Sequence, residues 1–451
     1  MNASRTTLVI VLLCLGLPSA AQTQSDKQVV QRLTLHEAVQ MALKQNHVVR
    51  IAELRVEEKQ HAKDVARSAY FPHIRNESRV FNVTDTQFIQ IAAGALGTVA
   101  GTTIPSQPAI LNQGGKTFVT SGTGLVQPLT QLFTRVKPSN EIARADLGAT
   151  RANAKETGNE IALKVHQLYY SVLITQLQRN ASKARIKAAE DLKSERTQEV
   201  NYGSALDREL IESTAQYLQA KQELLTSELQ LSNLTMQLDD ILGLPLTTHL
   251  ELEPVPSEQL VSCKAEECVK LALQSHPEIV AAREEVEKTS AAVKLSKADY
   301  VPDVSAFARY SYQNNVPFLA RNFGTFGVEV TYDLFDGGRR HAALDESNTR
   351  LAQARENLAR VTDEVELKVQ IAYNKLERTR EMVNVSKELL ALRTEASRVS
   401  AQQLQQGAAL QSQADHVNAQ KFDAETLLLQ SQLDYIQAHD EMTQVMGLTP
   451  E

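Results

Sequence analysis

Two long stretches of the chain contain no proline and almost no glycine, and this restricts the fold more than any other feature. None of the 13 prolines lies within 139–244 or 318–449. The 108 residues of 339–446 contain a single glycine, Gly407. The loops of a β-sandwich or a parallel α/β fold need such breakers about every 10 to 20 residues. We therefore exclude those folds and expect very long helices.

The aromatic residues are concentrated outside these stretches. Of the 22 Phe and Tyr residues, 15 fall within segments 70–133 and 300–335. The chain should therefore alternate two aromatic-rich segments with two helical blocks.

The N-terminus has the pattern of a secretory signal. Arg5 precedes an apolar run over residues 8–17, and the small residues Ser19 and Ala21 favour cleavage after residue 21. Lipidation at Cys14 is a weaker alternative.

No later segment reaches the ~18 consecutive apolar residues of a membrane helix. The full chain has a net charge of −7, which argues against nucleic acid as a partner.

Only two cysteines would remain after cleavage, Cys263 and Cys268. A metal site would need further ligands nearby, whereas export from the cytosol favours a disulfide. We expect these two residues to form one, joining a loop to the start of a helix.

An internal duplication organises the chain. Segment 37–43 aligns with 267–273 at an offset of 230, and Glu160, Leu163 and Tyr169 align with Glu364, Leu367 and Tyr373 at an offset of 204. The change of offset places 26 additional residues in the first copy. We expect a signal peptide over 1–21, a first repeat over 22–245, a linker over 246–264 and a second repeat over 265–451.

Each repeat should contain the same elements in the same order. Two short helices lead into extended, aromatic-rich segments, followed by a very long helix, a glycine turn and a return helix. The predicted helices span 35–46, 49–69, 139–201 and 205–242 in the first repeat, and 266–275, 278–299, 339–405 and 408–446 in the second.

The first return helix has a coiled-coil pattern. Its residues at seven-residue spacing are Leu210, Tyr217, Leu224, Leu231 and Leu238. The second return helix is less regular. A helix over 339–405 would be ~100 Å long, at about 1.5 Å per residue. No single globular core covers that length, so long helices packed side by side are expected.

The extended segments alternate apolar and polar residues with a period of two. Val304, Ala306 and Ala308 face one way, and Phe326, Val328 and Val330 repeat the pattern. Segment 118–127 is similar and 74–83 is weaker. Strands of about 9 to 11 residues cross a bilayer when tilted; a soluble four-stranded sheet is the alternative. Four strands cannot close alone, but three chains would supply twelve.

These features resemble the TolC family of outer-membrane efflux proteins. The resemblance depends on the duplicated plan, the Tyr-x-Pro motifs at 70–72 and 300–302, segment 334–338 (Leu-Phe-Asp-Gly-Gly), the turn glycines and the closing Gly-Leu pairs. It covers essentially the whole mature chain.

The resemblance implies a mainly α fold with membrane β-structure. A homotrimer would form a twelve-stranded β-barrel in the outer membrane above a periplasmic α-barrel, with a belt drawn from 22–35 and 246–264. Implied partners are a periplasmic adaptor protein and an inner-membrane pump of RND or ABC type. The implied function is a passive exit channel for small molecules, drugs or metal ions. A type I protein secretion duct, or less readily a periplasmic adaptor or scaffold, remains the alternative.

The helix-hairpin turns are the strongest candidate sites. Glycine permits the left-handed backbone that reverses a helix, and in the family these turns form the tip that meets the adaptor. The predicted docking residues are Tyr202, Gly203, Ser204, Ala205, Gln406, Gly407, Ala408 and Ala409.

Two other features distinguish this chain from the family pattern. The residues before the second turn, 401–406, lack the acidic residue that forms a luminal ring in some members. Glu195 and Glu199 could supply such a ring, or could be solvated residues of the outer face. The additional segment around 88–115 could form an enlarged outer loop or a plug.

Catalytic patterns find little support. The ten histidines are scattered, and we find no metalloprotease or Ser-His-Asp spacing and no phosphate-binding loop. We therefore expect neither enzymatic activity nor a cofactor.

Overall fold

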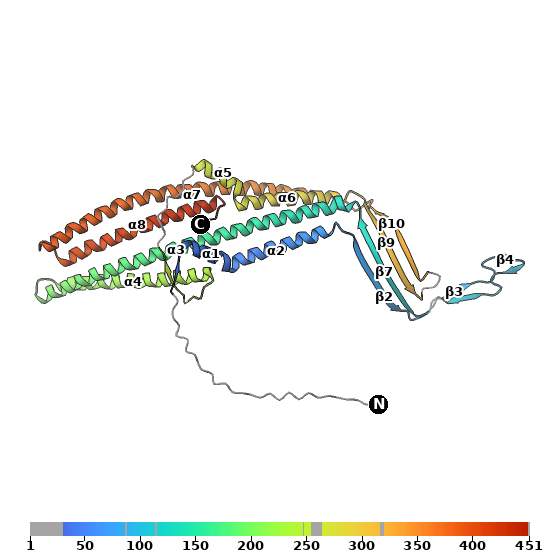
Figure 1. The fold of residues 1–451 in the computed structure, drawn as a ribbon, viewed down its shortest axis with the longest axis horizontal. Helices are drawn as coiled ribbons and strands as arrows, with labels where there is room; N and C mark the ends of the chain where they lie inside the picture. Colours follow the sequence, from blue (N-terminus) through green and yellow to red (C-terminus); the bar gives the residue numbers. More distant parts are fainter. Residues whose placement is uncertain are drawn as a thin grey trace, which may run out of the picture.

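The computed structural model describes residues 30–85, 88–112, 115–246, 248–253, 264–315 and 320–449. It is a long, mostly helical molecule with one sheet at one end (Figure 1). The predicted signal peptide over 1–21, Cys263 and part of the predicted linker lie outside the described residues.

The order of elements repeats along the chain. The first set comprises α1 (Leu35–Gln45), α2 (His47–Ser68), β2 (His73–Asn82), β7 (Thr117–Pro128), α3 (Lys137–Asn201) and α4 (Asp207–Leu242). The second comprises α5 (Ala265–Ser275), α6 (Pro277–Ala298), β9 (Asp303–Asn314), β10 (Asn322–Thr331), α7 (Arg339–Gln405) and α8 (Gln411–Val445). The prediction of two equivalent long helical hairpins is confirmed, with helix ends within about three residues of those expected.

Equivalent caps begin the short helices. Thr34 and Glu37 form a capping box at α1. Asn46 accepts a hydrogen bond from the Val48 amide at the start of α2, at 2.8 Å. At the same place in the second repeat, His276 Nδ1 accepts from the Glu278 amide at 3.2 Å. An amide and an imidazole thus perform the same local task.

The helices form a wall one helix thick. In the half that leads to the turns, α3 lies between α4 and α8, and α8 contacts α7. In the half that leads to the sheet, α3 lies between α2 and α6, and α6 contacts α7 (Figure 1). The helix α3 is therefore interior to the wall, whereas α7 forms one edge. None of the helices in the described ranges is both long and apolar enough to cross a membrane.

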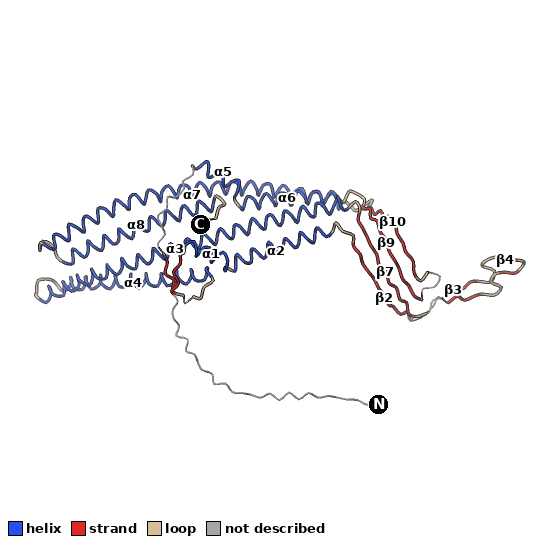
Figure 2. Tube along the Cα trace, in the orientation of Figure 1, coloured by secondary structure: helices blue, strands red, loops and turns tan. Residues whose placement is uncertain are grey.

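The predicted strands form one antiparallel sheet of order β10-β9-β7-β2 (Figure 2). The register places Phe326 opposite Ala308 and Val328 opposite Ala306, so apolar residues of both strands share one face. Directly opposed residues lie on the same side of an antiparallel pair. This arrangement confirms the alternation predicted for these two strands.

The opposite face of the sheet combines charged residues with Phe307 and Phe323. It carries Arg309 on β9, with Arg75, Glu77 and Arg79 on β2. The Arg309 side chain crosses Gly122 of β7, where an added Cβ would lie 2.7 Å from Nη2. Glycine therefore makes room for a guanidinium on this face.

The hydrophobic core lies midway along the wall. In the first repeat Tyr169, Leu238 and Leu242 are fully buried with their neighbours. In the second repeat Val365, Val369 and Met442 form a smaller cluster. Beside the first cluster, β1 (Val30–Leu33) pairs in parallel with β8 (His249–Leu252), so the two segments expected to supply a belt lie together.

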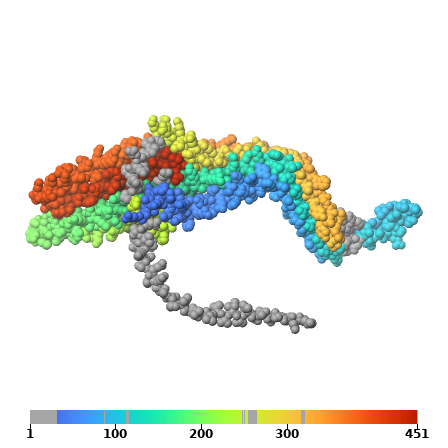
Figure 3. Space-filling view, in the orientation of Figure 1, coloured from blue at the N-terminus to red at the C-terminus, as the bar shows by residue number. Residues whose placement is uncertain are grey.

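The additional segment of the first repeat forms a two-stranded ribbon. β3 (Phe88–Ile91) pairs with β6 (Ala109–Asn112), and β4 (Thr98–Val99) pairs with β5 (Thr102–Thr103) near the far end. The ribbon projects beyond the sheet (Figure 3). The segment expected to form an enlarged outer loop is thus a regular hydrogen-bonded hairpin.

Candidate docking tip and conduit wall

Both helix-hairpin turns reverse the chain through a glycine in the left-handed region. Gly203 has φ 71° and Gly407 has φ 70°. The Ser204 amide donates to the Glu199 carbonyl at 2.9 Å, and the Ala408 amide donates to the Gln403 carbonyl at 2.8 Å. These bonds satisfy carbonyls that the helix end would otherwise leave free. The structural role predicted for the two glycines is confirmed.

The two turns lie together at the end of the molecule opposite the sheet (Figure 1). Tyr202 is 87% exposed, and Leu206 and Leu410 are exposed beside the turns. Ser204 and Ala408 are exposed too, whereas Ala205 and Ala409 are half-buried. The predicted docking residues thus lie at one end of the molecule, next to exposed apolar side chains.

The two acidic residues before the first turn have different surroundings. Glu199 forms an ion pair with Arg196, so its charge is locally balanced. Glu195 is half-buried, and its Oε2 has no hydrogen-bond partner among the described residues. The acidic ring stays a prediction.

A groove of about 1040 Å³ lies over α3 between α4 and α8. Arg185 of α3 lies in it and donates to Asp423 of α8 at 2.7 Å and to Glu223 of α4 at 3.1 Å. Its hydrogen bond to Asp423 is the main cause that raises the pKa of Arg185. One guanidinium therefore connects three helices.

A buried polar cluster joins the two hairpins near the core. His166 Nδ1 of α3 lies 2.6 Å from Asp440 Oδ2 of α8, and the Tyr170 hydroxyl donates to the same oxygen at 3.0 Å. Burial alone would raise the pKa of Asp440, but hydrogen bonds from His166, His439 and Tyr170 outweigh it and lower that pKa. The cluster connects the repeats through a charged group that is largely buried.

A second set of titratable groups lies beside the C-terminal end. Burial, with the nearby charges of Glu278 and Glu160, raises the pKa of Glu156 to about 7. Lys155 Nζ donates to the Gly447 carbonyl at 2.8 Å, which ties α3 to the segment after α8. Burial lowers the pKa of His276, consistent with its ring nitrogen accepting a hydrogen bond as the cap of α6.

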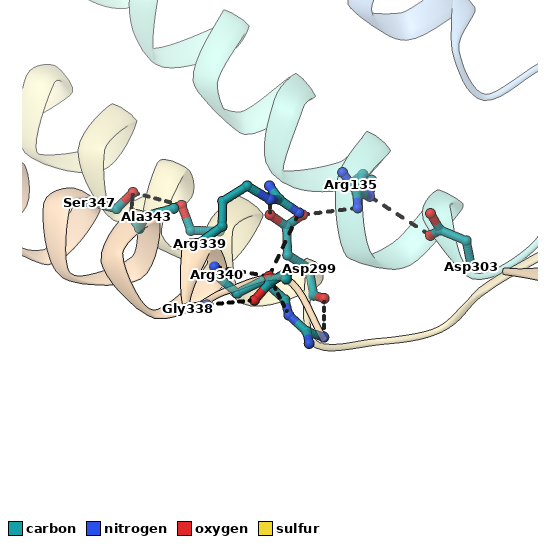
Figure 4. A network of polar contacts seen from close by, with 10 residues as sticks. Arg135, Asp299, Asp303, Gly338, Arg339, Arg340, Ala343 and Ser347 are labelled. Atoms are coloured by element: carbon teal, nitrogen blue, oxygen red, sulfur yellow. Dashed lines mark hydrogen bonds and ion pairs between the residues drawn. The ribbon is translucent and has the colours of Figure 1, made fainter. Parts of the chain in front are cut away.

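Ion pairs join the ends of the helices beside the sheet (Figure 4). Arg135, before α3, lies 2.9 Å from Asp299 at the end of α6, and Arg339 of α7 approaches the same carboxylate at 3.7 Å. Asp336 accepts from the amides of Gly338 and Arg340 at 3.1 Å and so begins α7. Segment 334–338 therefore acts as a helix start.

The predicted disulfide falls partly within the described residues. Cys268 is fully buried at the start of α5 and is disulfide-bonded. Cys263, its expected partner, lies outside them.

The two edges of the helical wall carry uncovered apolar stripes. On α4 the stripe consists of Ile211, Leu218, Leu225, Leu229 and Met236. On α7 it consists of Leu367, Ile371, Met382, Val385, Leu392 and Val399. Contiguous exposed apolar surface of this extent marks an interaction site.

Sequence reasoning missed the charged groups that connect helices. Arg185, His166 and Asp440 belong to no motif. For Asp440 a signal did exist, because a charged residue occupies a helix position whose equivalent in the first repeat is the apolar Met236. In the described part of the chain, no three His, Cys, Asp or Glu side chains are placed to hold a metal ion.

Known proteins share this architecture. The CusC structure superposes with a TM-score of 0.72 at 17% identity, covering 92% of each chain. The Campylobacter jejuni CmeC outer membrane channel gives a TM-score of 0.72 at 12% identity, covering 92% of this chain and 85% of that one. The Vibrio cholerae outer membrane protein VceC gives a TM-score of 0.73 at 15% identity, covering 92% of this chain and 97% of that one. Comparison with curated proteins gives no significant match.

The helical wall and attached sheet define the fold of an outer-membrane channel protein. The family model described as outer membrane efflux protein matches residues 268–448, which comprise most of the second repeat. The chain is similar to this family over its second repeat, and it shares the fold of the outer-membrane channels over 92% of its length.

Proposed function

We propose that three copies of this chain close into one tube, which serves as the exit channel of a tripartite efflux pump for small molecules, drugs or metal ions. The observation that carries the proposal is the match between the two uncovered edges of the wall. Both edges carry exposed apolar side chains, so the α4 edge of one protomer can pack against the α7 edge of the next.

The apolar stripes match in height. Ile211, Leu218 and Leu225 lie 8, 15 and 22 residues after Gly203. On α7, Val399, Leu392 and Val385 lie 8, 15 and 22 residues before Gly407. Because both turns lie at the same end of the molecule, these residues come level when α4 of one protomer lies along α7 of the next. Spacing by sevens is the spacing of a coiled-coil seam.

The chain contains a template for this seam. The contact between α3 and α8 is internal, and α3 and α8 are the repeat equivalents of α7 and α4. Leu229 of α4 is 64% exposed, but its equivalent Leu433 on α8 is 9% exposed. Val385 of α7 is 66% exposed, but its equivalent Ala181 on α3 is 5% exposed. At these two positions an uncovered residue corresponds to one that the internal seam covers, whereas Phe422 and Leu429, the equivalents of Leu218 and Leu225, stay partly exposed.

The sheet edges support the same closure. β2 lies on the side of α2 and α4, and β10 lies on the side of α7 (Figure 1). Each edge strand has backbone groups that no other described strand pairs. A membrane sheet cannot leave such groups in lipid and must close. Twelve strands from three chains would close it around a water-filled lumen.

The turns fit an adaptor-docking tip. Tyr202 and Leu206 are exposed at the end of the helical wall, and they contribute nothing to its buried core. A periplasmic adaptor and an inner-membrane pump would supply the energy, since the conduit is passive. The acidic pair Glu195 and Glu199 would lie one to three helical turns above this tip. If they line the lumen, replacing both with Gln should reduce cation preference in bilayer recordings.

The assembly is tested by paired cysteines. Leu225→Cys with Val385→Cys should give disulfide-linked oligomers in outer membranes, because the two residues lie at the same height. Leu225→Cys with Val399→Cys is the matched control and should not cross-link. Purified protein should show a heat-modifiable trimer and stepwise conductance in planar bilayers. A monomer recovered in the soluble periplasmic fraction would contradict the proposal.

A larger side chain at the exposed position Ser204 tests whether the tip docks a partner. Ser204→Trp should abolish export of a small-molecule substrate while trimers still form, because Ser204 makes no contact that the fold needs beyond its own turn. Ser204→Ala removes the 2.9 Å bond from the hydroxyl to the Glu199 carbonyl but keeps the size, so export should persist. Unchanged export in Ser204→Trp cells would remove the tip from the docking surface.

A further inference from the structure

The ribbon formed by β3 to β6 is unlike the rest of the molecule in composition. From 86 to 115 the chain has no charged residue, although 22% of all its residues are charged. Asp85 and Lys116 stand immediately outside this segment. A loop that only joined two strands in water would have no reason to exclude charge over such a length.

The ribbon is a regular element. Beyond the β3–β6 pair, the Gly94 amide donates to the Pro105 carbonyl and the Leu96 amide donates to the Ile104 carbonyl, both at 2.9 Å. The β4–β5 pair then closes the far end. The hydrogen-bonded hairpin thus extends well beyond the sheet and has a defined shape.

Both faces of the ribbon carry exposed apolar side chains. The register places Ile89 opposite Leu111 on one face and Ile110 opposite Gln90 on the other. Ile110 is 66% exposed, and Phe88, Leu96 and Val99 are exposed to a similar degree. An isolated two-stranded ribbon is marginally stable in water. This one needs cover, and the described part of the chain provides none (Figure 3).

The backbone restricts what the cover can be. In a two-stranded ribbon, each strand has one edge whose amide and carbonyl groups are unpaired. Lipid cannot satisfy such groups, because open sheet edges do not occur in the hydrocarbon region. Another strand satisfies them directly, and an uncharged edge without proline is a template for such pairing. The segments β3 and β6 contain neither charge nor proline.

The place where the ribbon is attached indicates which strand can pair with its open edges. It continues from the β2–β7 pair, and β2 is the sheet edge that meets the neighbouring protomer in the proposed trimer. A twelve-stranded barrel with strands ~4.8 Å apart and tilted ~40° is roughly 25 Å across. Each arm of the ribbon has about twelve residues, an extended reach of ~40 Å. Three ribbons on one rim can therefore meet above the mouth.

We propose that the three ribbons of the trimer associate with one another and form an apolar cap over the outer mouth of the channel. This inference rests on the proposed trimer, and its occupant is a second copy of the same segment. The cap would need to part, or to leave side openings, for cargo to leave. Its apolar, uncharged surface would hinder ions while the channel is idle.

The test places one cysteine near the ribbon end in the full chain. Leu96→Cys, oxidised in intact outer membranes, should convert most of the protein to disulfide-linked dimers. Lys116→Cys, at the ribbon base, is the control and should remain monomeric on denaturing gels. The Leu225→Cys, Val385→Cys pair reports the trimer independently. If the Leu225→Cys, Val385→Cys pair cross-links and Leu96→Cys does not, the proposed cap is wrong but the proposed trimer is supported. If neither cross-links, both the cap and the trimer are contradicted.

Single-channel conductance and contact with lipid provide two further tests of the cap. Ile89→Asp with Ile110→Asp introduces charge on both faces, and the mean single-channel conductance should rise at least two-fold. Unchanged conductance with an intact trimer would overturn the cap. A polarity-sensitive dye at Leu96→Cys that is quenched by nitroxide lipids would overturn it too, and would assign the ribbon to the membrane surface.

Discussion

The two long helices α3 and α7 come from equivalent sequence units but occupy different places in the wall. Helix α3 has neighbours on both sides, and its midsection buries Val165, Tyr169 and Tyr170. The corresponding stretch of α7 buries Val369 but exposes Leu367 and Ile371. The difference lies in the surroundings more than in apolar content, because α7 has no neighbour beyond the edge.

This comparison shows how duplication can build a tube. If α7 of one protomer meets α4 of the next, as α3 meets α8 within the chain, each hairpin gains two neighbours. The environments then become nearly equivalent around the ring. Positions where the two repeats carry different residues should then show where the internal α3–α8 seam and the α7–α4 seam between protomers use different contacts.

The largest expected effect breaks the seam between protomers. Leu225→Asp places a charge at the centre of the α4 stripe, and burying an unpaired carboxylate costs several kcal/mol in each of three seams. We expect trimers to be lost on native gels and by light scattering. The adjacent Thr226→Asp lies at the same height but outside the stripe, so its trimers should persist.

A charge pair sharpens the same comparison. Adding Val385→Lys to Leu225→Asp places opposite charges at matched heights, and trimers should be partly restored. Adding Val399→Lys instead places the charge about two heptads away and should not restore them. Equal rescue by both lysines would show that the helices do not align at the expected height.

The next effect breaks the internal seam, where the equivalent contact is polar. Asp440→Asn removes the charge that His166 and Tyr170 bind, leaving a buried imidazole poorly paired, and should cost about 3 kcal/mol. Thermal unfolding of the detergent-solubilised protein measures this loss. Met236→Asn, at the equivalent position on α4, should weaken trimers more than it lowers protomer stability.

Smaller still is the effect at the glycines that end the return helices. Gly447 has φ 77°, and an added Cβ would lie 2.7 Å from the Ser275 carbonyl oxygen and 2.8 Å from His276 Cα. Gly243 has φ 72°, but its Cβ would meet only the Gln45 side chain, at 3.2 Å. Gly447→Ala should cost about 2 to 3 kcal/mol and Gly243→Ala about 1. Equal shifts in unfolding temperature would contradict this ranking.

The regular parts of this fold were predictable because local signals decide them. The absence of breakers gave the long helices, the glycines gave the turns, and alternation gave the strands. The coiled-coil pattern was clear on α4, which packs on α3 alone among the helices of its own wall half, so Leu210 to Leu238 form one stripe. It was unclear on α8, because that helix lies between α3 and α7 and buries small residues such as Ala424 and Ala438.

The contacts between repeats were not predictable in the same way. The pair of His166 and Asp440 joins residues 274 positions apart, and Arg185 reaches Asp423 across 238. Such pairs depend on how the hairpins are arranged side by side, which local periodicity does not encode. The regular structure of the ribbon was missed for a related reason, since small residues and glycines resemble an irregular loop.

The smallest effect tests the helix cap that differs between the repeats. His276 caps α6 through a neutral ring nitrogen, and burial lowers its pKa. A lowered folded-state pKa means that the cap contributes fully above the unfolded pKa of about 6.5 and weakens as the pH falls below it. His276→Asn copies Asn46 of the first repeat, which does not titrate. Between pH 7.5 and 5.5 the natural chain should lose about 0.5 to 1 kcal/mol relative to this variant. Glu156 acts in the opposite direction, because its raised pKa of about 7 makes ionisation costly as the pH rises. Parallel unfolding curves for both proteins isolate the cap, and an identical pH dependence would show that folding does not lower the pKa of His276.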